Sequence, residues 1–251
     1  MSEHHRVGIL GAMEPEVRGL VQTMRVEQQG RSAGFDYWLG GLAGRDCVVA
    51  RCGMGKVSAA AGVQRLIDEF AIDCLVVCGL AGGLAAGLKV GDVVVGERFV
   101  QHDLDASPIY PRFEVPGLGI TQFAADAVLV QLAEAAAGDF IGRVFGTIDA
   151  AKALGITNPR VHRGLIVTGD QFVRDDRRSE LTGALPGALC VEMEGGAIAQ
   201  VCHLNGLPFV IVRVISDNAD SDAAVDFKRF VETVAPAYAV GIVSLLLASL
   251  E

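Results

Sequence analysis

Two acidic residues stand at the end of a predicted strand, where they could carry out acid–base chemistry. Glu192 and Glu194 flank Met193 in an otherwise apolar segment. Alternation along a strand places Glu192 and Glu194 on the same side. Two carboxylates on one side of a buried strand are costly unless each has a partner or a ligand. The pattern therefore favours a ligand-binding or catalytic role over a purely structural one.

A second polar cluster, Arg213 to Asp217, follows the apolar run Phe209–Val212 and contains Ser216. An aspartic acid can donate a proton near neutral pH only if burial raises its pKa. The apolar strand before Asp217 predicts such burial. A helix cap, or a salt bridge between Arg213 and a glutamate, is the structural alternative.

Two further segments could contribute to the same site. Glu14 and Glu16 open a predicted helix, where the helix dipole favours negative charge. Capping is the simpler interpretation of Glu14, whereas Glu16 is equally open to capping and to a site role. The glycine-rich segment Gly79–Gly83 follows a buried strand and lets the backbone approach a ligand closely, although a tight turn would need the same residues.

The elements that must position these residues alternate between strand and helix patterns. Strands are predicted over Arg6–Leu10, Asp46–Cys52, Asp73–Gly79, Val90–Val100, Leu165–Thr168, Leu189–Met193 and Pro208–Ile215, and helices over Pro15–Met24, Lys56–Phe70, Phe123–Ala137 and Gly195–Asn205. This order predicts a single α/β domain over residues 1–251, with a mixed, mostly parallel central sheet flanked by helices. The less regular stretch 138–163 is a candidate insertion. Ligands of open α/β sheets bind at the carboxyl ends of strands, where the polar clusters fall.

Composition excludes several classes of function. The formal net charge of −9 disfavours nucleic acid and anionic membranes as partners. The six cysteines have no metal-binding spacing, and we interpret them as buried, reduced thiols. The N-terminal residues contain no apolar signal sequence, so a cytoplasmic protein is expected. Val234–Leu250 is uncharged but too short to span a bilayer, which predicts a closing helix, kinked or restarted at Pro236.

One glycine-rich segment resembles a nucleotide-binding loop but lacks two of the residues that this motif requires. Gly53-Met54-Gly55-Lys56 looks like the end of a P-loop, yet Ala50 stands where that motif needs glycine and Val57 where it needs Ser or Thr. ATP hydrolysis is therefore not supported.

Taken together, the motifs resemble the methylthioadenosine/S-adenosylhomocysteine nucleosidases of the nucleoside phosphorylase superfamily. The likeness spans almost the whole chain, and its most specific parts are the Glu-Met-Glu and Ser-Asp sequences in this order. It rests on residues 8–14, 53–57, 81–84, 91–94, 164–167, 169–170, 191–194 and 213–217. The resemblance implies a nucleoside phosphorylase-like fold and release of adenine from a 5′-thio-substituted adenosine, as in methionine salvage.

The resemblance also implies catalytic roles. Asp217 would protonate N7 of adenine, with Ser216 orienting the base. Glu16 would hold and activate the attacking water, and Arg213 would lie near the carboxylates and that water. N-glycosidic cleavage needs these parts, because it passes through a sugar cation and requires an acid on the leaving group and a base on the water.

Substrate contacts are implied in the same way. Glu194 would bind the ribose hydroxyls, Met193 would pack against the sugar, Phe172 would stack on adenine and the backbone at Val173 would read its edge. The remaining residues assigned to substrate binding are Met54, Ala81, Gly82 and Glu192. No metal or organic cofactor is required. A homodimer is expected from the resemblance.

Two other functions remain open from the sequence. A glutamate at position 16 repels phosphate and suits water, yet a phosphorylase, or a nucleosidase for a different purine nucleoside, is the alternative. It is motivated by Leu80, which stands where members of the family usually carry Ser or Thr. A catalytically inactive nucleoside-binding protein is the third hypothesis, against which Glu16, Glu194 and Asp217 all argue.

Overall fold

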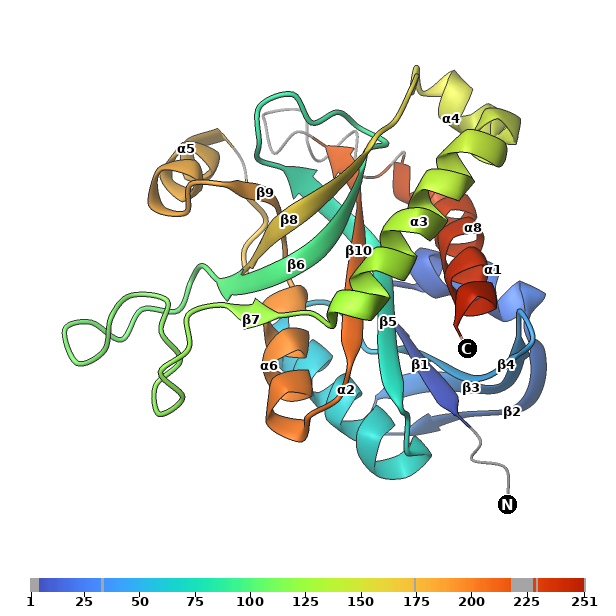
Figure 1. Ribbon diagram of the computed structural model, residues 1–251, viewed down its shortest axis with the longest axis horizontal. Helices are drawn as coiled ribbons and strands as arrows, with labels where there is room; N and C mark the ends of the chain where they lie inside the picture. Colours follow the sequence, from blue (N-terminus) through green and yellow to red (C-terminus); the bar gives the residue numbers. More distant parts are fainter. Residues whose placement is uncertain (1–4, 33, 174, 218–227, 229, 251) are drawn as a thin grey trace.

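A mixed ten-stranded sheet runs through the molecule, with helices on both of its faces (Figure 1). The computed structural model describes residues 5–32, 34–173, 175–217, 228 and 230–250. The strands are β1 Arg6–Gly11, β2 Arg25–Ser32, β3 Phe35–Leu42, β4 Arg45–Arg51, β5 Cys74–Gly83, β6 Val93–Gln101, β7 Phe123–Ala124, β8 Val161–Thr168, β9 Ala188–Glu192 and β10 Phe209–Asp217. The helices are α1 Glu14–Thr23, α2 Lys56–Phe70, α3 Ala127–Arg143, η1 Phe145–Thr147, α4 Asp149–Ala153, α5 Asp175–Ala184, α6 Gly195–Asn205 and α8 Ala235–Ser249.

Strand β5 is the centre of the sheet. It pairs with β1 and β10 in parallel and, at Gly82 and Gly83, with β9 in antiparallel fashion. Because β10 also pairs with β6, and β8 joins β6 to β9, strands β5, β10, β6, β8 and β9 close into a ring. Strands β4, β3 and β2 extend the sheet beyond β1. The carboxyl ends of β1, β5 and β10, which run parallel, therefore meet at one edge.

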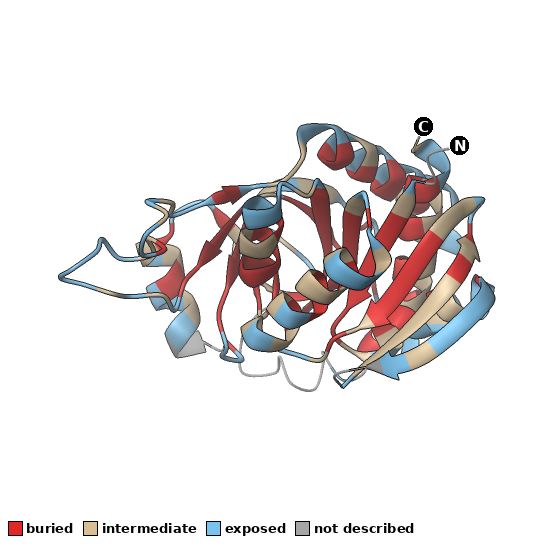
Figure 2. Cartoon of the chain, turned by 90° about the horizontal axis from the view of Figure 1, so that it is seen from below, coloured by how far each residue is buried: buried red, intermediate tan, exposed pale blue. Residues whose placement is uncertain are grey.

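Apolar residues fill both faces of the sheet. One buried cluster joins the strands to α1, α3 and α8, and a second joins them to α2 and α6. Figure 2 shows the buried residues gathered in the strands and on the inner sides of the helices, with exposed residues on the outer sides. Strand β10 is buried along its whole length, which explains its nearly unbroken apolar sequence.

The predicted α/β class and its main strands and helices are confirmed, with corrections at the periphery. The sheet is mixed, as predicted, and its antiparallel part includes a meander of β2, β3 and β4. Strands β2 and β3 were not predicted: β2 is an edge strand with largely exposed polar side chains and lacks an apolar repeat. Helix α5 was also not predicted, since its sequence has little apolar periodicity.

The start of α3 also differs from the prediction. Phe123 and Ala124 pair with β6 instead of opening the helix. The helix begins at Ala127, after Asp126, whose carboxylate accepts hydrogen bonds from the amides of Val128 and Leu129 at 2.9 Å.

The C-terminal helix has the restart near Pro236 that its sequence predicts. Helix α8 begins at Ala235, after a turn at Val234, so the chain restarts its helix with Pro236 in the first turn. No helix within the described ranges combines the length and apolar character needed to cross a membrane. Residues 138–163 hold the end of α3, η1, α4 and the start of β8; their interpretation as an insertion stays a prediction.

Candidate active site

A cavity of about 300 Å³ opens where β1, β5, β9 and β10 end. Every predicted site residue lines it except Arg213, which lies directly behind its wall. The lining residues are Ala12, Met13, Glu16, Met54, Leu80, Ala81, Gly82, Gln171, Phe172, Val173, Val191, Glu192, Met193, Glu194, Ser216 and Asp217. The fold thus brings together six segments of the sequence, namely residues 12–16, 54, 80–82, 171–173, 191–194 and 216–217.

Glu16 reaches the cavity from the first turn of α1 and is only 3% exposed. Its Oε2 accepts hydrogen bonds from the amides of Ala12 and Met13, both at 2.8 Å, and its Oε1 accepts one from the amide of Leu80 at 3.2 Å. The carboxylate therefore caps its own helix, and the residue also lines the cavity. Burial raises the pKa of Glu16, against the lowering effect of Arg213 and the three amides. Glu14 is exposed and forms an ion pair with Arg18, as a structural residue would.

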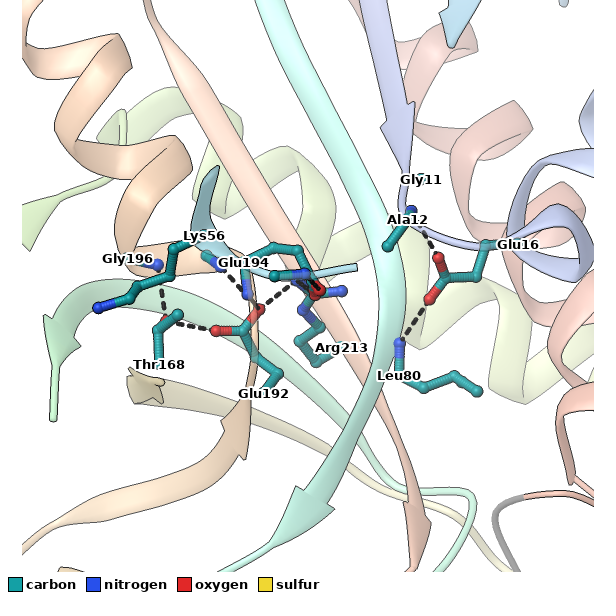
Figure 3. A network of polar contacts seen from close by, with 12 residues as sticks. Gly11, Ala12, Glu16, Lys56, Leu80, Thr168, Glu192, Glu194, Gly196 and Arg213 are labelled. Carbon is teal, nitrogen blue, oxygen red and sulfur yellow. Dashed lines mark hydrogen bonds and ion pairs between the residues drawn. The ribbon is translucent and has the colours of Figure 1, made fainter. Parts of the chain in front are cut away.

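Arg213 is the centre of the charge network behind the cavity (Figure 3). Its side chain is buried and pairs with the carboxylates of Glu192 and, at 3.4 Å, Glu194. Burial works against its charge, but Glu192, Glu194 and Glu16 outweigh that effect and raise the pKa of Arg213. The guanidinium thus stays protonated and supplies one positive charge to three buried carboxyl groups.

Both carboxylate oxygens of Glu192 accept hydrogen bonds from the protein. One oxygen accepts from the Thr168 hydroxyl, and the other accepts from the amides of Glu194 at 3.0 Å and Gly195 at 2.7 Å, as well as from Arg213. This carboxylate lies at the start of α6, where the helix dipole favours it. Its contacts make it a support for Arg213 and α6.

Glu194 is brought next to Glu192, but not by strand alternation. Strand β9 ends at Glu192, and Glu194 occupies the N-cap position of α6. Its Oε1 accepts a hydrogen bond from the amide of Gly55 at 2.9 Å, and its Oε2 lies 3.4 Å from Nη2 of Arg213. Burial raises the pKa of Glu194 to about 7, against the lowering effect of Arg213.

The raised pKa of Glu194 predicts a dependence of stability on pH. The pKa of Glu194 in the folded protein lies above the ordinary value of 4.5. Its contribution to the free energy of unfolding is therefore complete below pH 4.5 and is lost as the pH rises through about 7. We expect the melting temperature of the ligand-free protein to fall between pH 5 and pH 8, and Glu194→Gln to reduce that slope. Thermal denaturation across the pH range tests this. An unchanged slope in Glu194→Gln, or an equal change in the exposed-site control Glu14→Gln, would contradict it.

Ser216 and Asp217 come from the end of β10. The pairing of β10 with β5 shifts register between Ile215 and Asp217, and this irregularity places Asp217 opposite Gly82. The Ser216 hydroxyl donates to the Asp217 carboxyl at 2.9 Å. Asp217 is 3% exposed. Asp217 is therefore buried where it lines the cavity.

The mouth of the cavity is apolar and more exposed. Phe172 is 50% exposed and Met54 is 62% exposed. The Val173 side chain packs into a small apolar cluster with Leu181 of α5 and with Leu185, which follows that helix. Its backbone is thereby fixed at the edge of the cavity, just before the unpredicted helix.

Two nearby cysteines do not take part in this arrangement as nucleophiles. Burial raises the pKa of Cys52 and of Cys78 to about 12, with added effects from the surrounding carboxylates. Both thiols are therefore neutral near pH 7. In the described part of the chain, all six cysteines are free, and the side chains of His, Cys, Asp and Glu form no cluster suited to a metal ion.

Sequence reasoning missed Thr168 and included Gly79 only as part of a glycine-rich segment, because the roles of both residues depend on distances. Thr168 links Glu192 to α6, because its hydroxyl also accepts from the amide of Gly196 at 2.6 Å. Gly79 separates Glu16 from Arg213. The signal for these roles in the sequence was their position, since Thr168 and Gly79 each end a predicted strand.

Gly79 gives a test of how tightly these charges are packed. A Cβ at this position would lie 2.0 Å from Nη1 of Arg213 and 2.7 Å from Oε1 of Glu16. Gly79→Ala is expected to lower the free energy of unfolding by about 1–3 kcal/mol and to reduce turnover. The control is Gly83→Ala on the same strand, where the nearest atom would be at an ordinary 3.4 Å. Equal melting temperatures for the two variants would show that the site tolerates the extra methyl group.

Fold and site define an α/β protein with an acid-lined small-molecule cavity at the carboxyl edge of its sheet. The family model of the phosphorylase superfamily matches residues 6–250, and the chain belongs to this superfamily. It is 37% identical over 242 residues to the 5′-methylthioadenosine/S-adenosylhomocysteine nucleosidase of Shewanella denitrificans, covering 96% of this chain and 98% of that protein. It is 39% identical over 243 residues to the nucleosidase of the same name from Geobacillus kaustophilus, covering 96% of each.

Solved structures show the same relationship. The Neisseria meningitidis 5′-methylthioadenosine/S-adenosylhomocysteine nucleosidase in complex with methylthio-immucillin-A superimposes with a TM-score of 0.87 at 38% identity, covering 98% of this chain and 99% of that one. The futalosine hydrolase of Helicobacter pylori superimposes with a TM-score of 0.84 at 29% identity over the whole of both chains.

Proposed function

We propose that this protein hydrolyses the N-glycosidic bond of 5′-methylthioadenosine and S-adenosylhomocysteine, releasing adenine and the thio-substituted ribose. One observation carries the proposal: Glu16, Glu194 and Asp217, from distant parts of the chain, line one cavity. The similarity to nucleosidases over nearly the full length supports the same activity.

The proposed reaction assigns one step to each carboxyl group. Asp217 donates its proton to N7 of adenine as the bond between C1′ and the base breaks. Glu16 accepts a proton from the water that attacks C1′ on the opposite side. Glu194 accepts hydrogen bonds from the ribose hydroxyls. Each proton transfer of this kind contributes about 10²–10⁴-fold to the rate.

The charges of the cavity favour water over phosphate as the nucleophile. Its described lining contains the four carboxyl groups of Glu16, Glu192, Glu194 and Asp217 and no lysine, arginine or histidine. Arg213 lies behind the wall and is already paired with glutamates. A phosphate dianion entering this cavity would be repelled, whereas a neutral water molecule would not.

The direct test is adenine release from a panel of 5′-substituted adenosines, with and without phosphate. We expect release from 5′-methylthioadenosine and S-adenosylhomocysteine in phosphate-free buffer. A strict phosphate requirement would identify a phosphorylase instead. Binding without turnover would support the inactive nucleoside-binding protein.

A different purine nucleoside is the second candidate substrate. The Leu80 side chain lines the cavity in place of a polar group, and the futalosine hydrolase of Helicobacter pylori has the same fold. Futalosine-type nucleosides therefore belong in the panel. Cleavage of these alone, with 5′-thio nucleosides inert, would favour this second function.

We further propose that the protein acts in the cytoplasm as a homodimer. Large apolar side chains are exposed around the cavity mouth and on the neighbouring loop, including Val57 and Ile109, each 81% exposed. Free cysteines fit a reducing compartment. Sedimentation that shows a stable monomer at micromolar concentration would contradict the dimer.

A further inference from the structure

Three loops meet at the rim of the cavity and are joined by one small set of charged side chains. The first loop, residues 53–56, carries Met54 into the lining and gives its Gly55 amide to Glu194. The second, residues 169–173, carries Phe172 and Val173. The third begins at Asp103, after β6. The first loop thus adjoins the carboxylate proposed to hold the sugar, and the second the residues proposed to hold the base.

Asp103 contacts both of the other loops. Its Oδ1 accepts a hydrogen bond from Nζ of Lys56 at 2.6 Å, and its Oδ2 accepts one from the amide of Asp170 at 3.0 Å. The Lys56 and Asp103 side chains are 19% and 21% exposed, so their ion pair is largely shielded from solvent. Burial opposes the charge of Asp103, but Lys56 and the Asp170 amide outweigh it and lower its pKa. The Asp103 carboxylate therefore stays charged near neutral pH.

Asp170 joins the second loop directly to the first. Its Oδ1 accepts a hydrogen bond from the amide of Lys56 at 2.8 Å, at the N-terminus of α2. Gly55, which precedes α2, has φ +92°, and a Cβ there would lie 3.0 Å from the same Asp170 oxygen. Asp170 therefore supplies from another loop the cap that Gly55 cannot provide. Figure 3 shows Lys56 alongside Glu192, Glu194 and Arg213.

We propose that Lys56, Asp103 and Asp170 form a clasp of positioning residues that fixes the sugar-side wall of the cavity, residues 53–56, relative to the base-side wall, residues 169–173. This inference rests on the proposed function. Cleavage requires the sugar and the base to be held in one geometry, and a misplacement of about 1 Å can cost about 100-fold in rate. The clasp acts through Gly55 on Glu194 and through the 169–173 loop on the base.

The test replaces Lys56 with methionine, which keeps the length of the side chain and removes its charge. We expect kcat/KM for the nucleoside to fall about 10- to 100-fold, with a raised KM. Inhibition by adenine alone should be unchanged, because the contacts proposed for adenine, at Phe172, Val173, Ser216 and Asp217, do not include the sugar-side wall. Lys56→Arg should restore most of the activity. The matched control is Arg163→Met. This variant also breaks an ion pair of 2.6 Å, with Glu97, but that pair joins two strands of the sheet, β8 and β6, and no loops at the rim of the cavity.

Hydrogen exchange gives a readout that needs no turnover. In Lys56→Met, the amides of residues 53–57 and 169–173 should exchange faster, with no such change in Arg163→Met. Unchanged exchange in both segments, or activity equal to that of Arg163→Met, would overturn the clasp. Equal weakening of adenine and nucleoside binding would also overturn it. A wild-type protein inert toward 5′-thio nucleosides would instead refute the proposed function, and the exchange data would still decide whether Lys56 joins the loops.

Discussion

Replacing Asp217 with asparagine is expected to slow adenine release by about 10²–10⁴-fold while nucleoside binding is retained. Asparagine has the same shape as aspartic acid and can still accept the hydrogen bond that Ser216 donates at 2.9 Å. It cannot transfer a proton to the leaving base. Because the side chain is 3% exposed, bulk water cannot readily take over that transfer. The effect should therefore fall on kcat, and it is measured by adenine release together with calorimetric binding of 5′-methylthioadenosine.

The matched variant is Ser216→Ala, which keeps the carboxyl group and removes the hydrogen bond that Ser216 donates to it. Loss of one such bond is worth about 1 kcal/mol, so its rate should fall by about fivefold. Turnover in Asp217→Asn comparable to that of Ser216→Ala would show that Asp217 is not the proton donor. Loss of binding in Asp217→Asn would point to a role in holding the base.

Glu16→Gln is the second substitution with a large expected effect, again about 10²–10⁴-fold in kcat. Glutamine fills the same space but is a far weaker base, so the attacking water would lose its proton acceptor. A stability cost is also expected. The three amides of Ala12, Met13 and Leu80 now donate to two carboxylate oxygens, and the glutamine NH₂ group would have to face at least one of them. A buried donor left without an acceptor costs about 1–3 kcal/mol.

Two measurements separate these effects. The melting temperature reports the stability cost, and the rate is measured well below that temperature. Glu14→Gln is the control, because Glu14 lies on the same helix turn but is exposed and forms an ion pair with Arg18. Folded Glu16→Gln with a rate close to that of Glu14→Gln would exclude Glu16 as the catalytic base.

The arrangement of carboxyl groups explains why such a site can be stable at all. Buried carboxylates are costly unless each has a charge partner or hydrogen-bond donors. Here Glu16 has three amides, Glu192 has two amides, the Thr168 hydroxyl and Arg213, and Glu194 has the Gly55 amide and Arg213. The site is therefore built largely from backbone donors, which sequence patterns do not reveal.

The sequence by itself determined the α/β class, the central strands and the segments that carry the candidate site. Long apolar runs such as Phe209–Val212 can be buried on both faces of a sheet, and polar residues that follow such runs fall at its ligand-binding edge. Local periodicity carries this information, so the prediction held for β1, β9 and β10. Strand β5 was predicted to end at Gly79, but it continues through the glycine-rich segment to Gly83. The prediction failed for β2 and α5, which have polar or irregular sequences and owe their structure to their neighbours.

Only the tertiary structure decided how the site is assembled. Closing β5, β10, β6, β8 and β9 into a ring brings Arg213 against Glu192 and Glu194, and the register shift after Ile215 places Asp217 opposite Gly82 at the cavity. Glu194 meets Glu192 across the start of α6, not along a strand. Gly79 lies close to both Glu16 and Arg213, and Asp103 binds both Lys56 and the amide of Asp170. Each of these contacts joins chain segments that are far apart in sequence. Local patterns cannot encode them, because the physical interactions exist only once the sheet has closed.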